Sequence, residues 1–323
     1  MDKITLAHGG GGKRTRELIS NLFLKYLGNP YLKILTDGVN LGDLKRTVVT
    51  TDGFVVDPLF FPGGNIGKLA ICGICNDLAV MGAKPKFITM NFIIEEGFLT
   101  LDLEKIIKSI ASEAKSAGID IVAGDTKVVP KGHGGGIYIS GTGVGEMVYK
   151  NDLPGKIKEG DLVFVNGSIG DHSAALLVAR NDFKLSSKLK SDCQNIYPEI
   201  KNLLDKSKEV KFLRDITRGG LAAILNELAE YASCGIEIAE NSIPFKKEVL
   251  SLCAMLGYDF LTLACEGRFL AVIDANDEKI ALSMGLTKIG AITDNHKKVV
   301  LKTKIGGERV IDLPDGELLP RIC

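Results

Sequence analysis

Segments with a strand pattern and segments with a helix pattern alternate along this chain, and the alternation begins again after a polar break. Strand patterns, rich in β-branched and apolar residues, occupy residues 47–51, 87–94, 120–123 and 137–148. Apolar residues at helical spacing occupy residues 18–27, 66–81 and 101–117. The polar stretch 151–160 is typical of a boundary between domains. A chain of 323 residues is long enough for two domains, so we predict an α/β (α+β) fold in two domains.

The second half repeats this pattern with less regularity. We expect strands at residues 162–166, 269–274 and 299–301, and helices at 173–179 and 218–232. Residues 185–195 are polar, which indicates an excursion over the surface. Residues 304–323 have no periodicity and contain two prolines and three glycines, so they are expected to form a mobile arm. The expected units are therefore residues 1–150, 151–303 and 304–323.

The charge balance and the apolar runs exclude several classes of protein. Lys and Arg number 40, as do Asp and Glu, so no excess charge favours nucleic acid or an anionic membrane. No apolar run approaches the roughly 20 residues of a membrane-spanning helix. The first residues lack the pattern of a signal peptide, and seven cysteines are an odd number for a disulfide framework. We expect a cytoplasmic protein with mostly reduced thiols.

Glycine is over-represented, with 37 residues that gather in clusters. One cluster directly precedes the first predicted helix and consists of His8, Gly9, Gly10, Gly11, Gly12 and Lys13. Unhindered backbone amides near a helix N-terminus favour an anion such as phosphate. The spacing does not fit a P-loop, and a flexible start to the chain is the alternative for this motif alone.

Four aspartates lie beside small residues at the ends of predicted elements: Asp37, Asp52, Asp77 and Asp125. A single Asp-Gly pair usually indicates a turn. Four such residues in a chain with a glycine loop instead favour Mg²⁺, because this hard cation prefers carboxylate and phosphate oxygens. We therefore predict a site for a nucleotide phosphate with Mg²⁺.

Three further loops carry groups that could act in chemistry. The loop after Asp125 holds Lys127, Lys131 and His133, although a solvated charge cluster is the alternative. The segment 215–221 precedes a predicted helix, and capping by Asp215 or Thr217 explains much of it. Glu266 follows the apolar stretch 260–265, so its carboxyl group is expected to be desolvated and more basic than usual.

The cysteines fall into two kinds. Cys72 and Cys75 form a C-x-x-C without a second pair, which indicates helix packing and not a zinc site. Four others are expected to be buried or incidental thiols: Cys193, Cys234, Cys253 and Cys265. Cys323 ends the predicted arm, where an exposed thiol could carry a group or act as a nucleophile.

Taken together, these motifs resemble the HypE family of hydrogenase maturation proteins, within the PurM-like ATP-binding superfamily. The resemblance runs nearly end to end, from the cluster at His8 to the end of the chain. The motif Asn76-Asp77-Leu78-Ala79 with Met81-Gly82-Ala83 is shared across the superfamily. The ending Pro320-Arg321-Ile322-Cys323 is specific to HypE.

The resemblance implies a PurM-like architecture whose N-terminal domain forms a homodimer, with ATP near the interface. It also implies that ATP drives the dehydration of an S-carboxamide on Cys323 to an S-cyanide, which supplies the cyanide ligands of [NiFe]-hydrogenase iron. HypF would load the carbamoyl group, and a HypC–HypD complex would hold the iron. Asp37, Asp52, Asp77 and Asp125 would surround Mg²⁺; Thr126, Lys127 and the loop from His8 to Lys13 would bind ATP; and Lys131 with Glu266 would lie beside the carboxamide.

Two other functions stay open at this point. One is a superfamily kinase or synthetase, such as thiamine-monophosphate kinase or selenophosphate synthetase, with the same aspartates. The terminal Cys323 argues against it, and no cysteine precedes Cys72 to serve a selenophosphate synthetase. The other is a non-catalytic scaffold that carries a group on Cys323, in which ATP controls only the docking of a partner protein.

Overall fold

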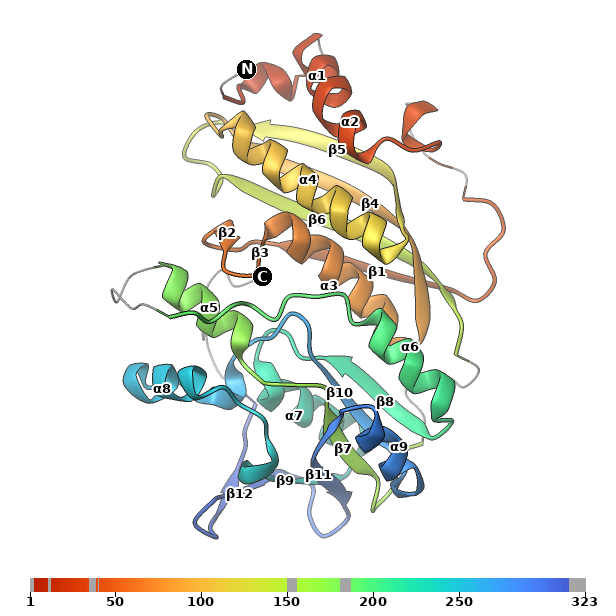
Figure 1. The fold of residues 1–323 in the computed structure, drawn as a ribbon, viewed down its shortest axis with the longest axis vertical. Helices are drawn as coiled ribbons and strands as arrows, with labels where there is room; N and C mark the ends of the chain where they lie inside the picture. Colours follow the sequence, from red (N-terminus) through yellow and green to blue (C-terminus); the bar gives the residue numbers. More distant parts are fainter. Residues whose placement is uncertain are drawn as a thin grey trace.

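The structure, a computed structural model, describes residues 3–10, 13–34, 39, 41–149, 156–180 and 187–313. Its upper part in Figure 1 contains a four-stranded sheet. In spatial order the strands are β1 (Thr47–Phe54), β6 (Ile137–Met147), β4 (Ala83–Glu95) and β5 (Asp120–Val129). β4 and β5 are parallel and the other pairs are antiparallel. β1 and β5 are therefore the two opposite edges of this sheet.

Helices cover one face of the four-stranded sheet. They are α3 (Ile66–Val80), α4 (Thr100–Ala117) and an N-terminal helix made of α1 (Lys13–Leu18), a π-helical turn (Ile19–Phe23) and α2 (Leu24–Leu27). α3 lies very close to β6 because that strand has glycines where the two meet. A Cβ atom at Gly143 would lie 2.4 Å from Cγ2 of Ile74. These glycines fix the height of α3, and with it Asp77, above the sheet.

The opposite face of the four-stranded sheet, which we call the open face, carries exposed side chains. Val49 of β1 is 61% exposed and Ile93 of β4 is 36% exposed. A groove on this face runs from Thr51 of β1 to Asp125 of β5. Because side chains alternate along a strand, Thr51 lies on the open face and its neighbour Asp52 on the helical face.

The second half contains a seven-stranded sheet. In spatial order its strands are β13 (Glu308–Val310), β12 (Val299–Lys302), β9 (Gly235–Ala239), β11 (Thr287–Thr293), β7 (Leu162–Val165), β10 (Phe269–Ile273) and β8 (Val210–Asp215). The helices of this half are α5 (Asp171–Arg180), α6 (Tyr197–Lys206), α7 (Gly220–Ala232), α8 (Lys247–Leu256) and α9 (Glu278–Ser283). The short elements are η1 (Leu6–His8), η3 (Leu32–Ile34), β2 (Phe60–Phe61), β3 (Gly64–Asn65), η4 (Glu240–Ser242), η5 (Phe260–Thr262) and η6 (Ala275–Asp277).

Continuous apolar packing joins the two halves. One core cluster combines α3 and α4 with Leu176 of α5, Leu252 of α8 and Ala264. A second cluster packs Ala79 and Val80 at the end of α3 against α6 and β10. Because residues far apart in sequence share these cores, α3 has a fixed position between the two sheets (Figure 1).

Most predicted elements are present within a few residues of their expected bounds. The helices expected at residues 66–81 and 101–117 are α3 and α4, and Gly118 ends α4 in the left-handed conformation, with φ of 66°. The six cysteines that the structure describes are buried, as expected for packing residues. The prediction missed several elements of the second half, namely α6, β8, β9, α8, α9 and β11.

Three local predictions were wrong. Residues 187–195 are not a surface excursion along their whole length, because Leu189, Asp192 and Cys193 are buried between the two halves, whereas Lys188 and Lys190 are exposed. The strand expected at residues 120–123 continues to Val129, so Asp125 and Lys127 lie on a strand and not in a loop. Neither Asp215 nor Thr217 caps α7, which begins after Gly219 in the left-handed conformation, with no side-chain cap.

The first part of the segment predicted to be a mobile arm, residues 304–323, is instead folded. Residues 299–310 form a hairpin in which β13 pairs with β12. Ile311 is 5% exposed, and Asn226 of α7 donates a hydrogen bond to its carbonyl oxygen at 3.1 Å. The residues from Pro314 to Cys323 lie outside the described part of the chain.

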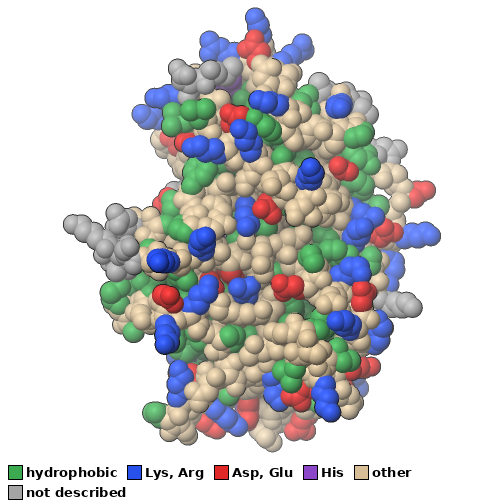
Figure 2. All heavy atoms as spheres, viewed as in Figure 1, with side chains coloured by type: hydrophobic (Ala, Val, Ile, Leu, Met, Phe, Trp, Pro, Cys, Tyr) green, Lys and Arg blue, Asp and Glu red, His purple; other side chains and the backbone are tan. Residues whose placement is uncertain are grey.

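The surface agrees with the balanced composition. Acidic and basic side chains intermingle over the face shown in Figure 2, without a large field of one sign. Among the described residues, no helix is long and apolar enough to span a bilayer.

Candidate active site

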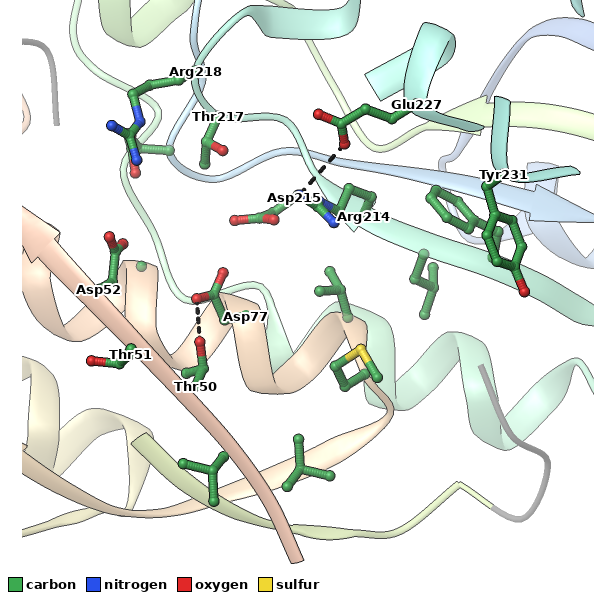
Figure 3. A pocket seen from close by; sticks show the side chains of 18 residues that line it. Thr50, Thr51, Asp52, Asp77, Arg214, Asp215, Thr217, Arg218, Glu227 and Tyr231 are labelled. Atoms are coloured by element: carbon green, nitrogen blue, oxygen red, sulfur yellow. Dashed lines mark hydrogen bonds and ion pairs between the residues drawn. The ribbon is translucent and has the colours of Figure 1, made fainter. Parts of the chain in front are cut away.

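A cavity of about 620 Å³ lies between the two halves, and we call it the cleft (Figure 3). Its first wall comes from β1 and α3. Its second wall comes from the end of β8, the turn that follows it and α7. The lining residues with polar groups are Thr50, Thr51, Asp52, Asp77, Arg214, Asp215, Thr217, Arg218, Glu227, Tyr231 and Glu266.

Two predicted aspartates meet on the first wall of the cleft. Thr50 donates a hydrogen bond from Oγ1 to Oδ2 of Asp77 at 2.7 Å, and the Gly53 amide donates to Oδ1 of Asp52 at 2.7 Å. Burial raises the pKa of both carboxyl groups, and the charge of Asp52 raises the pKa of Asp77 further. A bound cation would stabilise these two carboxylates, because it would offset both their desolvation and their mutual repulsion.

A third carboxyl group, that of Asp215, faces the first two from the end of β8. It is 6% exposed. Burial raises its pKa to about 7, with a further contribution from the charge of Asp77. We expected Asp215 or Thr217 to cap the following helix, whereas the structure places Asp215 in the cleft.

Arg218 points into the same space from the turn after β8 (Figure 3). Its positive charge acts on Asp52 and lowers the pKa of that carboxyl group against the larger effect of burial. Near the outer end of the cleft, Arg214 lies 3.5 Å from Glu227. The sequence analysis did not expect Arg218 to line a functional site. A basic residue directly before two glycines, at the predicted start of a helix, was an available signal.

Glu266 also lines the cleft and is 3% exposed. Its Oε1 has no hydrogen-bond partner among the described residues. Burial raises its pKa well above the ordinary value, and the charges of Asp192 and Asp215 add to this effect. The expected desolvated carboxyl group is therefore confirmed.

The other predicted nucleotide-binding residues gather at the opposite edge of the sheet, along β5. Lys127 lies 2.8 Å from Asp125, and their ion pair lowers the pKa of Asp125. Gly9, the first glycine of the cluster, lies beside the same strand, because a Cβ atom there would lie 2.6 Å from the Val128 nitrogen. Three strand spacings separate β5 from β1, which is about 14 Å. Within one chain, Asp125 is therefore remote from Asp52 and Asp77.

Several predicted residues have other surroundings than expected or lie outside the described residues. The imidazole of His8 is buried and accepts a hydrogen bond at Nδ1 from the Thr5 amide at 3.0 Å. Lys13 is exposed. Lys131 lies in the turn after β5, where its charge acts on Glu95, and it does not line the cleft with Glu266. The structure does not describe Gly11, Gly12, Asp37 and Cys323.

The chemistry of the cleft suits Mg²⁺ held jointly with phosphate. Within the described ranges, no three His, Cys, Asp or Glu side chains are close enough to hold a metal ion by themselves. Asp52 and Asp77 nevertheless supply the hard oxygen donors that Mg²⁺ prefers. Because Mg²⁺ keeps several water or phosphate ligands, two carboxylates are a sufficient protein contribution.

Comparison with known proteins finds a separate family match for each half of the chain. The N-terminal domain of AIR synthase related proteins matches residues 36–147, and the C-terminal domain of these proteins matches residues 158–302. The carbamoyl dehydratase HypE of Rhodobacter capsulatus is 40% identical over 335 residues, which cover 100% of this chain and 98% of the relative. The chain belongs to the HypE family.

Solved structures of HypE have the same fold. A crystal structure of HypE in complex with ATP superposes with a TM-score of 0.95 at 34% identity and covers 99% of both chains. A HypE–HypF complex superposes with a TM-score of 0.80 at 40% identity, over 92% of this chain and 99% of that chain. Thiamine monophosphate kinase from Aquifex aeolicus has a TM-score of 0.64 at 19% identity over 90% of this chain, which shows a shared fold alone. The predicted membership of the HypE family is thus confirmed.

Proposed function

We propose that this chain is an ATP-dependent carbamoyl dehydratase, which converts an S-carboxamide on Cys323 into an S-cyanide for the iron of [NiFe]-hydrogenase. The observation that carries this proposal is the cleft. It places Asp52 and Asp77 on one wall and Asp215 with Arg218 on the facing wall, with the desolvated Glu266 in the same cavity. Members of the HypE family that are 40% identical over the whole chain are named carbamoyl dehydratases, which supports the same reaction.

We place the triphosphate of ATP in this cleft, with Mg²⁺ on Asp52 and Asp77. The crystal structure of a HypE with bound ATP supports nucleotide binding. Mg²⁺ would neutralise phosphate charge and orient the transferred phosphoryl group. Arg218, on the facing wall, is positioned to bind the phosphate oxygens that gain charge during transfer.

The reaction needs both a phosphoryl acceptor and a base. An amide oxygen is a poor leaving group, so the carboxamide oxygen first attacks the γ-phosphorus of ATP and ADP leaves. The nitrogen loses one proton as this O–P bond forms. In the elimination it loses the second proton, the C–O bond breaks, phosphate leaves and the C–N bond becomes a nitrile. Glu266 is the base that we assign to this step, because a carboxylate without its usual solvation takes up a proton readily.

We infer that the complete site needs a second copy of the chain. One chain holds Asp52 and Asp77 at one edge of its sheet and Asp125, Lys127 and Gly9 at the other edge. An isologous dimer through the open face, which exposes Val49 and Ile93, brings unlike edges of two sheets together when its two-fold axis runs along the strands, and this is the arrangement that we propose. Asp125, Thr126, Lys127 and Lys131 of each chain would then serve the cleft of its partner.

The partners follow from the same reaction. We propose HypF as the source of the carbamoyl group, which the solved HypE–HypF complex supports. We propose a HypC–HypD complex as the acceptor that holds the iron. Both encounters require the thiol of Cys323 to leave the cleft, so the C-terminal residues must alternate between a partner and ATP.

Intact mass measurement tests the proposed function directly. The carbamoylated chain incubated with Mg-ATP is expected to lose the mass of one water and to release one phosphate per chain. Glu266→Gln should accept the carbamoyl group but stall before the nitrile, and Cys323→Ser should accept no group at all. Phosphate release without loss of water, or nitrile formation in Cys323→Ser, would contradict the proposal. Phosphate release without loss of water would favour a non-catalytic scaffold that only carries the carbamoyl group.

A further inference from the structure

Residues 187–196, which we call the crossing segment, pass between the two halves. The amide of Ser191 donates a hydrogen bond to the carbonyl oxygen of Pro62 at 2.8 Å, so the segment is tied to the first half. At its other end, the amide of Gln194 donates to the carbonyl oxygen of Glu266 at 3.4 Å. The crossing segment is thus bonded both to the first half, at Pro62, and to the backbone of Glu266 in the second half.

One side chain of α3 connects all of these parts. Asn76 is 2% exposed and donates from Nδ2 to the carbonyl oxygens of Gln194, at 3.1 Å, and Glu266, at 3.2 Å. Its Oδ1 accepts a hydrogen bond from the Ile196 amide at 2.9 Å. A buried amide group with three such bonds is costly to move, because each released partner would be left unsatisfied.

The next residue along the same helix is Asp77, which points into the cleft toward Thr50. Consecutive residues of an α-helix project about 100° apart, so Asn76 and Asp77 reach different surroundings from one rigid element. α3 therefore holds one carboxylate of the cleft with Asp77 and the backbone of another, Glu266, with Asn76.

The backbone N–H group of Glu266 is also held in place. Its N–H donates to Oδ1 of Asp192 at 3.2 Å. A Cβ atom at Gly267 would lie 2.0 Å from the Asp192 carbonyl oxygen, so the two backbones approach as closely as glycine allows. Since the backbone of Glu266 is fixed from both sides, its position follows that of α3.

We propose that Asn76 is a positioning residue, which fixes the backbone of Glu266 against α3 and so sets where the Glu266 carboxylate stands relative to Asp77. This inference rests on the proposed role of Glu266 as base. Asn76 itself does not line the cleft. Its effect on the reaction is through Glu266.

The test compares Asn76→Leu, which keeps the volume of the side chain without polar atoms, with Asn76→Ala, which leaves space for water. Asn226→Ala is the matched control, because Asn226 also donates to two carbonyl oxygens, those of Ala222 and Ile311, away from the cleft. All three variants are expected to lose some thermal stability. The Asn76 variants alone should lose roughly 10- to 100-fold in the rate of dehydration, while their Kd for Mg-ATP stays within about twofold of the parent.

A pH profile separates positioning from a purely structural role. If Glu266 shifts toward water in Asn76→Ala, its carboxyl group becomes more acidic, and the acidic limb of the rate profile moves to lower pH. An acidic limb that stays at the parental pH in Asn76→Ala, or a control variant whose dehydration slows equally, would overturn the inference.

A double-mutant cycle with Glu266→Gln distinguishes failure of this inference from failure of the proposed function. If Asn76 acts through Glu266, Asn76→Ala adds little to the defect of Glu266→Gln. Additive defects would overturn the positioning role while Glu266 keeps its assignment. An undiminished rate in Glu266→Gln alone would instead remove Glu266 from the mechanism, and with it the basis of the inference.

Discussion

At the scale of single residues, Asp215 shows how the cleft opposes the stability of the folded chain. Its pKa rises from the ordinary 3.8 to about 7, chiefly through burial. A carboxyl group whose pKa is raised by folding contributes stability below its unfolded pKa, and this stability is lost as the pH rises through the folded pKa. We therefore expect the free energy of unfolding of the unliganded protein to fall between about pH 4 and pH 7.

Asp215→Asn removes this titration. The Tm of the unliganded variant is expected to exceed that of the parent by a few degrees at about pH 8 and to show no such gain at about pH 4. Calorimetry across this pH range measures the difference. An equal change in Tm at both pH values would mean that ionisation of Asp215 is not the cause.

Arg218 allows a prediction about charge geometry. A guanidinium group binds phosphate with two parallel hydrogen bonds, which an ammonium group cannot do. We expect Arg218→Ala to lower the rate of phosphate release by roughly 100- to 1,000-fold, and Arg218→Lys to recover part of that loss. Arg309→Ala, which removes a surface ion pair with Asp259, is the control and should keep the parental rate. Similar rates for Arg218→Ala and the control would exclude Arg218 from the reaction.

The residues that sequence could and could not predict differ in how they acquire their role. Asp52 and Asp77 belong to local motifs, and the apolar stretch before Glu266 signalled its burial, so these were found. The roles that we propose for Arg218 and Asn76 depend on which distant segments of the chain face these side chains. An arginine in solvent and an arginine that lines a cleft have the same local sequence, and only the opposite wall of the cleft distinguishes them.

At the scale of elements, the contact of α3 with β6 is sensitive to volume. Gly143→Ala would place a methyl group 2.4 Å from Ile74, so α3 must shift away from the sheet. We expect a loss of about 1–3 kcal/mol in stability and weaker binding of Mg-ATP, because Asp77 moves with the helix. Gly53→Ala adds a methyl group with no atom within 4 Å and should leave Tm nearly unchanged. Equal Tm values for the two variants would show that α3 tolerates the displacement.

The hairpin of β12 and β13 sets where the chain can be shortened. Deletion of residues 314–323 is expected to leave Tm unchanged while abolishing carbamoylation. Deletion of residues 308–323 also removes β13, the buried Ile311 and the bond from Asn226, and should lower Tm by several degrees. Thermal unfolding of both truncated chains, followed by circular dichroism, measures this. If the longer deletion is equally stable, β13 contributes nothing to the fold.

Elements with a long periodic pattern were predictable, and short ones were not. α3 and α4 extend over 15 and 18 residues, which gives several turns of regular spacing. β13 has three residues, all exposed, and Ile305 in the turn before it is 96% exposed. β13 is a strand because its backbone pairs with β12, and its own side chains show no strand pattern that would predict this pairing.

At the scale of the whole molecule, sequence indicated two α/β halves but not how they meet. The crossing segment is polar, with Ser191, Asp192 and Gln194, which is why it was expected at the surface. The carbonyl oxygen of Gln194 and the amide of Ile196 instead bond to Asn76, and Oδ1 of Asp192 accepts a hydrogen bond from the Glu266 amide. Burial of a polar segment depends on partners supplied by both halves, and these are known only from the assembled fold.

A mixing experiment tests whether two chains share one site. Asp52→Asn and Asp125→Asn homodimers should both be inactive. If Asp52 of one chain works with Asp125 of its partner, a mixed dimer contains one site with both substitutions and one intact site. Random mixing makes half of the dimers mixed, so activity should return to about a quarter of the parental level.

The matched control mixes Asp52→Asn with Asp77→Asn. Both residues line the cleft of the same chain, so each chain of the mixed dimer has one defective carboxylate and no intact site arises. This mixture should stay inactive whichever way the dimer is built. If the Asp52→Asn and Asp125→Asn mixture also stays inactive, although mixed dimers are present by native mass spectrometry, then Asp125 does not serve the partner's cleft. The 14 Å between the edges β1 and β5 would then have to be bridged within a single chain, which requires β5 to move toward the cleft.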